Sequence, residues 1–271
     1  MATGHRTDDS REDGVAQRTH DRRWVVGRAT GLLIGFTWLV FLTGAESSAW
    51  GQRRAAVAPA QDEYLGRKIA PTMHFTGAEW LVRESRNREE DCRTMLEQLR
   101  VQPGQTICDM GCGNGFYTLQ LAELVGDTGK ILAVDIQPQM LRILQARAAE
   151  NQLKNVELIL GTEDDPKLPQ GKVDVILCVD VYHEFSKPAE MLKAMRQSLK
   201  PDGVVVLVEF REEDPEVPIL PLHKMSKAQV RKELTANGFE LVREFDGLPW
   251  QHMLFYRAAR PDSPAAPPAG N

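Results

Sequence analysis

The fold of this chain is decided by Thr106-Ile-Cys-Asp-Met-Gly-Cys-Gly-Asn-Gly-Phe-Tyr-Thr-Leu-Gln-Leu-Ala122. A short apolar run ends in Asp109, three alternating glycines follow, and a helical pattern begins at Phe116. This order predicts a strand, a tight loop and a helix N-terminus, in which backbone N–H groups can approach a ligand closely. Glycine suits the loop because a Cβ would obstruct that approach and because such loops use positive φ. The three glycines are Gly111, Gly113 and Gly115.

The spacing of these glycines separates two classes of nucleotide-binding protein. A dinucleotide fingerprint is G-x-G-x-x-G, and its third glycine would fall at Phe116. A nucleotide-dependent oxidoreductase, which shares the architecture, is therefore disfavoured. The pattern D-x-G-x-G-x-G places Asp109 before the loop, where an acid suits a ligand with a cationic amino group. A second acid, Asp135, closes the next apolar run twenty positions after Gly115 and could accept both hydroxyls of a ribose.

At these residues the chain resembles the class I S-adenosylmethionine (SAM) dependent methyltransferases, whose first two motifs look like D-x-G-C-G-x-G and V-x-V-D. The resemblance covers residues 66–257 and is most specific in the cofactor half. It implies an α/β fold: a doubly wound, mostly parallel seven-stranded sheet with helices on both faces and an antiparallel last strand. It also implies SAM as the cofactor, with Asp109 and the glycine backbone at the amino acid end. Asp135 and its neighbour Ile136 would lie at the ribose and adenine.

Alternating strand and helix patterns support a doubly wound sheet independently of that resemblance. Nearly continuous apolar runs predict strands at 106–109, 130–135, 156–160, 173–179 and 203–209. Helical patterns cover 116–125, 138–151, 188–199 and 227–236, and two further strands are expected at 239–245 and 251–257.

Length and composition fit one domain with tails: 271 residues, 42% hydrophobic, with a net charge of −5. No Lys/Arg-rich run is interleaved with aromatic residues, so a nucleic-acid substrate is disfavoured. The oligomeric state is left open. The four cysteines lack C-x-x-C spacing and are expected to be buried free thiols, although a bridge between Cys108 and Cys178 stays possible.

The N-terminal sixty-odd residues have the composition of a targeting segment. Residues 1–23 are polar and expected to be disordered, 24–49 form a signal peptide or membrane anchor, and 50–65 form a linker. Arg22-Arg23 before Trp24 and the apolar run 29–45 resembles a twin-arginine signal, which predicts an exported (periplasmic) or membrane-anchored protein; a cytoplasmic location is left open. Cleavage after Ala45 or Ala49 and an uncleaved anchor are both open. Residues 258–271 are a Pro/Ala tail, expected to be disordered.

The first part of the domain, residues 64–100, either packs over the cofactor or simply covers the sheet. The charged run 83–91 is predicted to be a solvated face. In the loop at 161–166, Thr162 stands where similar enzymes place an acid that receives the adenine amino group. That contact is therefore expected from Glu163, Asp164 or the backbone.

The fourth strand ends in the run Asp180-Val-Tyr-His-Glu184. Ligands bind at the carboxyl ends of strands in open α/β sheets, so Asp180, Tyr182, His183 and Glu184 are expected near the sulfonium. His183 is the candidate general base because its usual pKa lies near neutrality; the alternative is a structural loop histidine. His223 and His252 are expected to be surface or strand histidines, and no spacing of histidines and acids predicts a metal site. The proline-bracketed segment 218–225 is expected to line the acceptor pocket, as it does in similar enzymes.

Three functions agree with these patterns. The first is methyl transfer from SAM to a small-molecule acceptor by in-line displacement. The second is a catalytically silent SAM-binding module, which would keep Asp109 and Asp135 but methylate nothing. The third is a protein methyltransferase, which would need an open groove in place of a covered pocket.

The targeting segment generates one prediction. If the signal is of the twin-arginine type, replacing Arg22 and Arg23 with lysine should block export of the full chain, because that pathway recognises the arginine pair. More arginines precede the apolar run (Arg11, Arg18, Arg22 and Arg23 among them) than closely follow it (Arg53, Arg54), which favours an N-inside orientation. Cell fractionation tests this, and unmodified protein found wholly in the soluble cytoplasm would contradict it.

Overall fold

A computed structural model describes residues 62–260. The chain divides into two units, Met1–Ala55 and Ala56–Asn271, and the described residues belong to the second. The predicted signal or anchor at 24–49, most of the linker and nearly all of the Pro/Ala tail lie outside the described residues. Within 62–260, no helix combines the length and the apolar character needed to cross a membrane.

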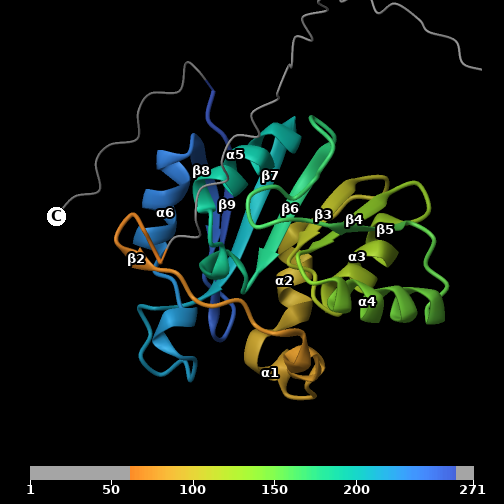
Figure 1. Ribbon diagram of the computed structural model, residues 1–271, viewed down its shortest axis with the longest axis horizontal. Helices are drawn as coiled ribbons and strands as arrows, with labels where there is room; N and C mark the ends of the chain where they lie inside the picture. The colour runs from red at the N-terminus through yellow and green to blue at the C-terminus, as the bar shows by residue number, and fades with distance from the viewer. Residues whose placement is uncertain (1–61, 261–271) are drawn as a thin grey trace, which may run out of the picture. The chain divides into compact units, whose positions relative to one another are not determined.

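A seven-stranded sheet forms the centre of the domain, with the strand order β5-β4-β3-β6-β7-β9-β8 (Figure 1). The pairs from β5 to β7 are parallel, whereas β9 is antiparallel to both of its neighbours. This topology confirms the predicted α/β class and the antiparallel strand that the resemblance implied. The strands are β3 (Thr106–Met110), β4 (Lys130–Asp135), β5 (Val156–Leu160), β6 (Val173–Val179), β7 (Leu199–Phe210), β8 (Phe239–Phe245) and β9 (Gln251–Ala258).

Helices cover both faces of the sheet because alternate strand residues point to opposite sides. One face packs against α5 (Pro188–Ser198) and α6 (Lys227–Ala236), with Met195 and Leu234 fully buried. The other face packs against α2 (Cys92–Leu99), α3 (Phe116–Val125) and α4 (Pro138–Glu150). The central strands are thus apolar on both sides, which explains why their sequences contain few alternating polar residues.

The helix boundaries follow from recognisable end signals. Prolines occupy the first turns of α4 and α5, where the missing N–H costs no helical hydrogen bond. The Ser226 side chain accepts a hydrogen bond from the Gln229 N–H and caps α6. The charged segment before β3 is broken at Asp91, whose φ of 47° ends α1 (Arg86–Glu90) and starts α2.

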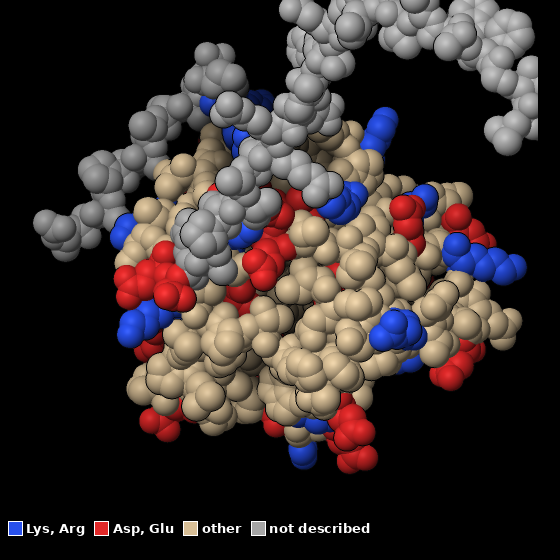
Figure 2. All heavy atoms as spheres, in the orientation of Figure 1, with Lys and Arg blue, Asp and Glu red and all other residues tan. Residues whose placement is uncertain are grey.

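All four cysteines are buried free thiols, as predicted. The bridge left open between Cys108 and Cys178 does not form because the parallel register pairs Cys178 with Met110 and Cys108 with Ile176. On the face shown in Figure 2, Lys and Arg side chains lie interspersed with Asp and Glu.

Before β3, the chain runs along the carboxyl edge of the sheet. It forms a small hairpin of β1 (Glu63–Tyr64) and β2 (Arg67–Lys68) and then the 3-10 helix η1 (Phe75–Val82). Figure 1 shows this orange segment passing in front of the strand ends toward α1. The segment therefore covers the edge of the sheet at which ligands bind in open α/β folds.

Candidate functional site

A cavity of about 470 Å³ lies at the carboxyl ends of β3, β4 and β6, a volume within the range of small-molecule sites. Of the predicted site residues, seven line it: Gly111, Gly113, Asp135, Ile136, Glu163, Asp180 and His183. Three do not: Asp109, Gly115 and Asp164. The segment before β3 contributes Thr72, Met73, Trp80, Leu81 and Arg86 to the wall, so it covers the cavity as one of the two sequence hypotheses held.

The Asp135 carboxylate ties the glycine loop to the end of β4. Its Oδ2 accepts a hydrogen bond from the Gly113 N–H at 2.9 Å, and its Oδ1 accepts one from the Gln137 N–H at 2.8 Å. The Gln137 side chain in turn donates to the Met73 carbonyl and accepts from the Phe75 N–H, both at 2.9 Å. Burial raises the pKa of Asp135 in spite of these N–H donors. This acid is thus positioned at the cavity wall by both the glycine loop and the segment before β3 that covers the cavity, which we call the covering segment.

Glycine is required in this loop by close packing as well as by conformation. Gly113 has a φ of 53°, and a Cβ there would lie 2.7 Å from the Leu81 Cδ1 in η1. Gly115 precedes α3 with a φ of 84°, and a Cβ there would collide with Leu144 of α4. Gly115 therefore serves the packing of two helices, whereas Gly111 and Gly113 form cavity wall.

Asp109 lies behind the loop and does not face the cavity. Its Oδ2 accepts a hydrogen bond from the Thr118 hydroxyl at 2.5 Å, and the residue is 4% exposed. Burial raises its pKa to about 6, against the opposing effects of Thr118 and Arg86. Asp109, which was predicted to hold the amino acid end of the cofactor, therefore lies behind the cavity wall and does not line the cavity.

Arg86 corrects the prediction that the run 83–91 is a solvated face. Both Arg86 and Glu90 are buried, and the Arg86 Nε lies 2.8 Å from a Glu90 carboxylate oxygen. Arg83 binds the other oxygen of Glu90 at 2.6 Å, and the Arg86 guanidinium lies over the Phe116 ring. Burial alone would lower the pKa of Arg86, but Tyr117 and Glu90 outweigh it and the net pKa is raised. The cavity wall therefore contains a permanent cation that charge patterning did not reveal.

The loop after β5 supplies one carboxylate to the cavity. Glu163 lines it, beside Ile136 and Gln137 from the end of β4. Asp164 instead accepts a hydrogen bond from the Thr162 hydroxyl at 2.7 Å and lies 3.7 Å from the Lys187 ammonium. Of the two acids predicted for the adenine contact, Glu163 is the one at the cavity.

Asp180 follows β6 in a left-handed conformation with a φ of 51°, uncommon for a non-glycine residue. The Gln251 side-chain amide donates to both of its carboxylate oxygens, at 2.9 and 2.7 Å. Burial, reinforced by Glu90 and Glu209, holds the pKa of Asp180 well above its usual range. The strained turn is maintained by this clamp from β9 and presents the acid to the cavity.

His183 lies in the 3-10 turn η2 (Tyr182–Glu184) and is 1% exposed. Its Nδ1 is 2.7 Å from the Glu209 Oε2, so a neutral ring that donates there has its Nε2 lone pair directed at the His223 Nδ1, 3.1 Å away. The other Glu209 oxygen accepts the Tyr182 N–H at 2.9 Å. Glu209 itself is fully buried at the end of β7. The imidazole is thereby oriented before any ligand arrives.

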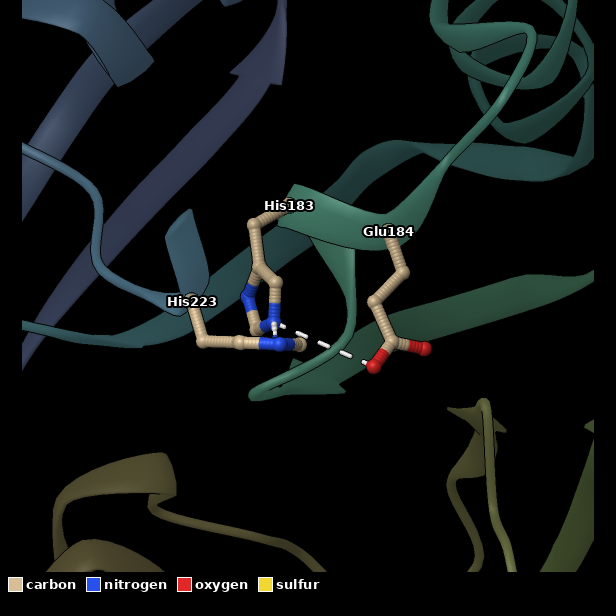
Figure 3. Close-up of side chains that lie close together, drawn as sticks. All are labelled: His183, Glu184 and His223. Atoms are coloured by element: carbon tan, nitrogen blue, oxygen red, sulfur yellow. Dashed lines mark hydrogen bonds and ion pairs between the residues drawn. The ribbon is translucent and has the colours of Figure 1, made fainter. Parts of the chain in front are cut away.

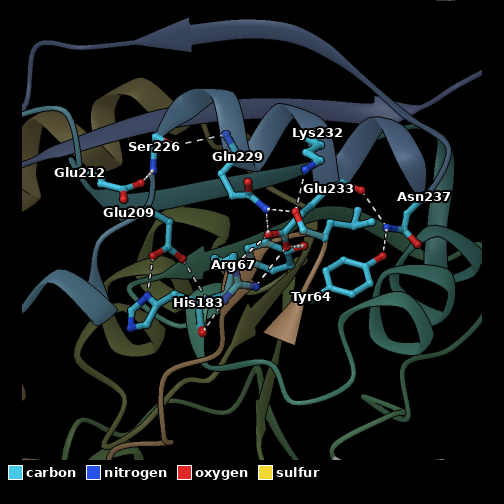
Figure 4. Close-up of polar contacts among 12 residues, drawn as sticks. Tyr64, Arg67, His183, Glu209, Glu212, Ser226, Gln229, Lys232, Glu233 and Asn237 are labelled. Carbon is cyan, nitrogen blue, oxygen red and sulfur yellow. Dashed lines mark hydrogen bonds and ion pairs between the residues drawn. The ribbon is translucent and has the colours of Figure 1, made fainter. Parts of the chain in front are cut away.

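A second set of contacts holds the backbone of His183 (Figure 4). Its carbonyl accepts from the Arg67 guanidinium at 2.8 Å and from the Ala70 N–H at 3.1 Å. Arg67 is also paired with Glu233 of α6 at 2.8 Å. The hairpin, η2 and α6 are therefore joined at this histidine.

Two expectations about residues close to His183 are wrong. Tyr182 was expected near the cavity but does not line it: the side chain is fully buried in the core on the α5 and α6 face of the sheet, and its hydroxyl donates to Glu233 at 2.7 Å. His223 was expected to be a surface histidine, but it lines the cavity with its Nδ1 3.1 Å from the His183 Nε2. His252 is a strand histidine of β9, as predicted, but it is fully buried and neither ring nitrogen has a hydrogen-bond partner among the described residues. Pro218, Ile219 and Leu220 also line the cavity, as expected for this segment.

Glu184 completes a group of three side chains around one point (Figure 3). The binding atoms of His183, Glu184 and His223 lie within 4.8 Å of one another. Burial raises the pKa of Glu184 to about 7, partly offset by His183. Burial and His183 also lower the pKa of His223. Sequence spacing did not indicate this group because 40 positions separate the two histidines.

Comparison with known proteins gives a consistent result. A family model described as a methyltransferase domain matches residues 102–254, which is 153 of the 271 residues. Demethylmenaquinone methyltransferase of Lactococcus lactis is 32% identical over 45% of this chain, and nocamycin O-methyltransferase of Saccharothrix syringae is 33% identical over 42%. These matches cover 47% and 41% of the relatives' own lengths, so the chain matches less than half of either. A SAM-dependent methyltransferase structure from Aquifex aeolicus has a TM-score of 0.65 and 25% identity, covering 68% of this chain and 98% of that one.

The buried Asp109 generates a prediction about stability and pH. Its pKa is raised from 3.8 to about 6 on folding, so the folded state favours the protonated acid. The resulting stabilisation is present below about pH 4 and is lost as the pH rises through about 6. Asp109→Asn keeps an acceptor for Thr118 but cannot ionise. At pH 4 the acid is protonated in the folded unsubstituted chain, whereas at pH 8 it is ionised. The unfolding free energy of the variant minus that of the unsubstituted chain should therefore increase by roughly 2–3 kcal/mol from pH 4 to pH 8. Denaturant unfolding at both pH values measures the gain, and parallel pH dependences would contradict it.

Proposed function

The chain belongs to the class I SAM-dependent methyltransferase family, and we propose that it transfers a methyl group from SAM to a small-molecule acceptor. One observation carries the proposal: the glycine loop and Asp135 line the same cavity as the group around His183, and the strand order β4-β3-β6-β7 puts the two groups toward opposite ends of it. A cofactor and an acceptor held at these two ends would meet between them. Orientation of this kind supplies a large part of the rate in displacement reactions.

The cofactor end offers complementary groups for each part of SAM. Arg86 is a buried cation that can hold the carboxylate of the amino acid end, and Asp180 is an acid that can hold its ammonium. We assign Asp135, which keeps lone pairs, to the ribose hydroxyls, and we assign Ile136 and Glu163, which also line the cavity, to the adenine. When bound, SAM supplies a methyl carbon on a sulfonium leaving group, so the protein has mainly to hold and align its two ligands.

The acceptor end combines apolar walls with a few polar groups. Phe185, Phe210, Ile219 and Leu220 line it, and His183 faces it. These side chains fit a partly apolar molecule whose nucleophilic atom is directed toward the imidazole. Two of the relatives are named for methylating small molecules, demethylmenaquinone and nocamycin, which supports the same class of acceptor.

The rival functions differ from this proposal in measurable ways. A protein methyltransferase needs a groove open to a peptide, whereas η1 and the segment 218–223 both contribute to the walls here. A silent module would bind SAM and leave every acceptor unmodified. The oriented His183 favours an enzyme over a silent module, because Glu209 and Arg67 are both engaged in positioning it.

Binding of SAM and its demethylated product tests the cofactor assignment. Asp135→Ala should weaken SAM binding by roughly 2–3 kcal/mol, or about 30–150-fold, because two hydrogen bonds to a charged group are lost. Asp202→Ala, at an exposed acid remote from the cavity lining, is the matched control and should bind normally. Isothermal calorimetry measures both variants. Saturable binding of NAD without any SAM heat would overturn the assignment.

A further inference from the structure

We propose that His183, Glu184 and His223 together bind one divalent transition-metal ion of the Zn²⁺ type at the acceptor end of the cavity. The role of the ion rests on the proposed function, because it would hold the methyl acceptor. The site itself rests on the arrangement of the three side chains in Figure 3.

The spacing of the binding atoms suits a small cation. The His183 Nε2 and the His223 Nδ1 are 3.1 Å apart, and two bonds of about 2.0–2.1 Å at a tetrahedral angle would place them about 3.3 Å apart. In the absence of an ion these two nitrogens share a hydrogen bond, with the rings at 88° to each other, so metal binding would displace the proton between them and release it to water. The Glu184 Oε1 is 4.0 Å from the His183 Nε2, and all three binding atoms lie within 4.8 Å of one another, so the carboxylate must move toward the two histidines to complete the set.

The surrounding contacts match those of established metal sites. Metal-binding histidines almost always donate their second ring N–H to a carboxylate or carbonyl, which fixes the tautomer. Here Glu209 takes that place at 2.7 Å from the His183 Nδ1. The ligating carboxylate is also held, because the Glu184 Oε1 accepts the Met73 N–H at 3.2 Å. Two of the three ligands are thus held in position by the protein.

The ligand types select the class of metal. Two imidazoles and one carboxylate suit Zn²⁺ and its neighbours, whereas Mg²⁺ and Ca²⁺ prefer oxygen ligands. Three protein ligands leave a fourth position open, which is the arrangement of catalytic zinc sites. All three residues line the cavity, so that open position faces the space assigned to the acceptor.

Charge balance favours a cation at this point. The Glu184 side chain is 10% exposed and the Glu209 side chain is fully buried, and both carboxylates contact the same imidazole. Buried charges in proteins are normally paired or coordinate metals. Arg67 interacts electrostatically with Glu209, but its hydrogen-bonded ion pair is with Glu233. A bound cation would compensate the two carboxylates.

The chemical role of the ion follows from its open position. An acceptor hydroxyl or thiol bound there would lose its proton to a water molecule, with the bonding electron pair left on the oxygen or sulfur that binds the metal. A bound cation lowers the pKa of such a group, as it does for metal-bound water. His183 would then act as a ligand and not as the free base that its sequence position suggested.

Metal binding by the full chain, prepared without an affinity tag and stripped with a chelator, tests the site. Titration with Co²⁺, followed by its d–d absorption, and with Zn²⁺, followed by calorimetry, should show one tight equivalent. His223→Ala should weaken binding by at least roughly 100-fold and Glu209→Gln by about 10–100-fold, since the latter removes only the carboxylate behind His183. His74→Ala is the control and should bind as the unsubstituted chain does, because the hydrogen bonds of this imidazole within residues 62–260 are to Thr76 of its own turn.

SAM calorimetry on the same samples separates this inference from the proposed function. Binding of SAM without a tight metal equivalent, or metal affinity equal in all variants, would overturn the metal site and leave the proposed function intact. Metal binding without SAM binding would overturn the proposed function and leave the metal site intact. Glu184→Gln provides a second ligand variant: normal SAM affinity shows that it is folded, and loss of the Co²⁺ spectrum then supports the site.

Discussion

The hydrogen bonds of Asp135 are the interaction on which the rest of the site depends. One carboxylate oxygen holds the Gly113 N–H and the other holds the Gln137 N–H. Through the Gln137 side chain, the same point also holds Met73 and Phe75 at the start of η1. The glycine loop, the end of β4 and the covering segment are therefore positioned by one acid. A ligand that binds this acid is enclosed by the elements that the acid has already organised.

A second buried acid, Glu209, performs the corresponding task at the other end of the cavity. It holds the Tyr182 N–H and the His183 ring, so the turn after β6 is fixed against the end of β7. Several acids at this edge have pKa values raised by burial, among them Asp109, Asp180 and Glu184. Desolvated acids cost stability in the free protein. Ligands with positive charge, such as a sulfonium cofactor or a metal ion, would recover part of that cost on binding.

The sequence predicted the sheet closely because central parallel strands are apolar on both faces: 130–135, 156–160 and 173–179 agree with β4, β5 and β6. It missed features that depend on distant contacts. Arg86 and Glu90 have a solvated sequence pattern, and burial follows only from their packing against Phe116 and Arg83. Tyr182 was misplaced because strand-end position does not specify which way a side chain in a 3-10 turn points. His223 approaches His183 only through the fold, across 40 residues of sequence.

Methyl transfer itself is the most direct test of the proposed function. The full chain would be incubated with SAM labelled in its methyl group and a panel of small molecules that carry phenol, quinol, thiol and amine groups. The account predicts that label appears in a small-molecule acceptor, with S-adenosylhomocysteine formed in equal amount. Label found in added proteins, or none transferred to any acceptor by a chain that binds SAM saturably, would contradict it.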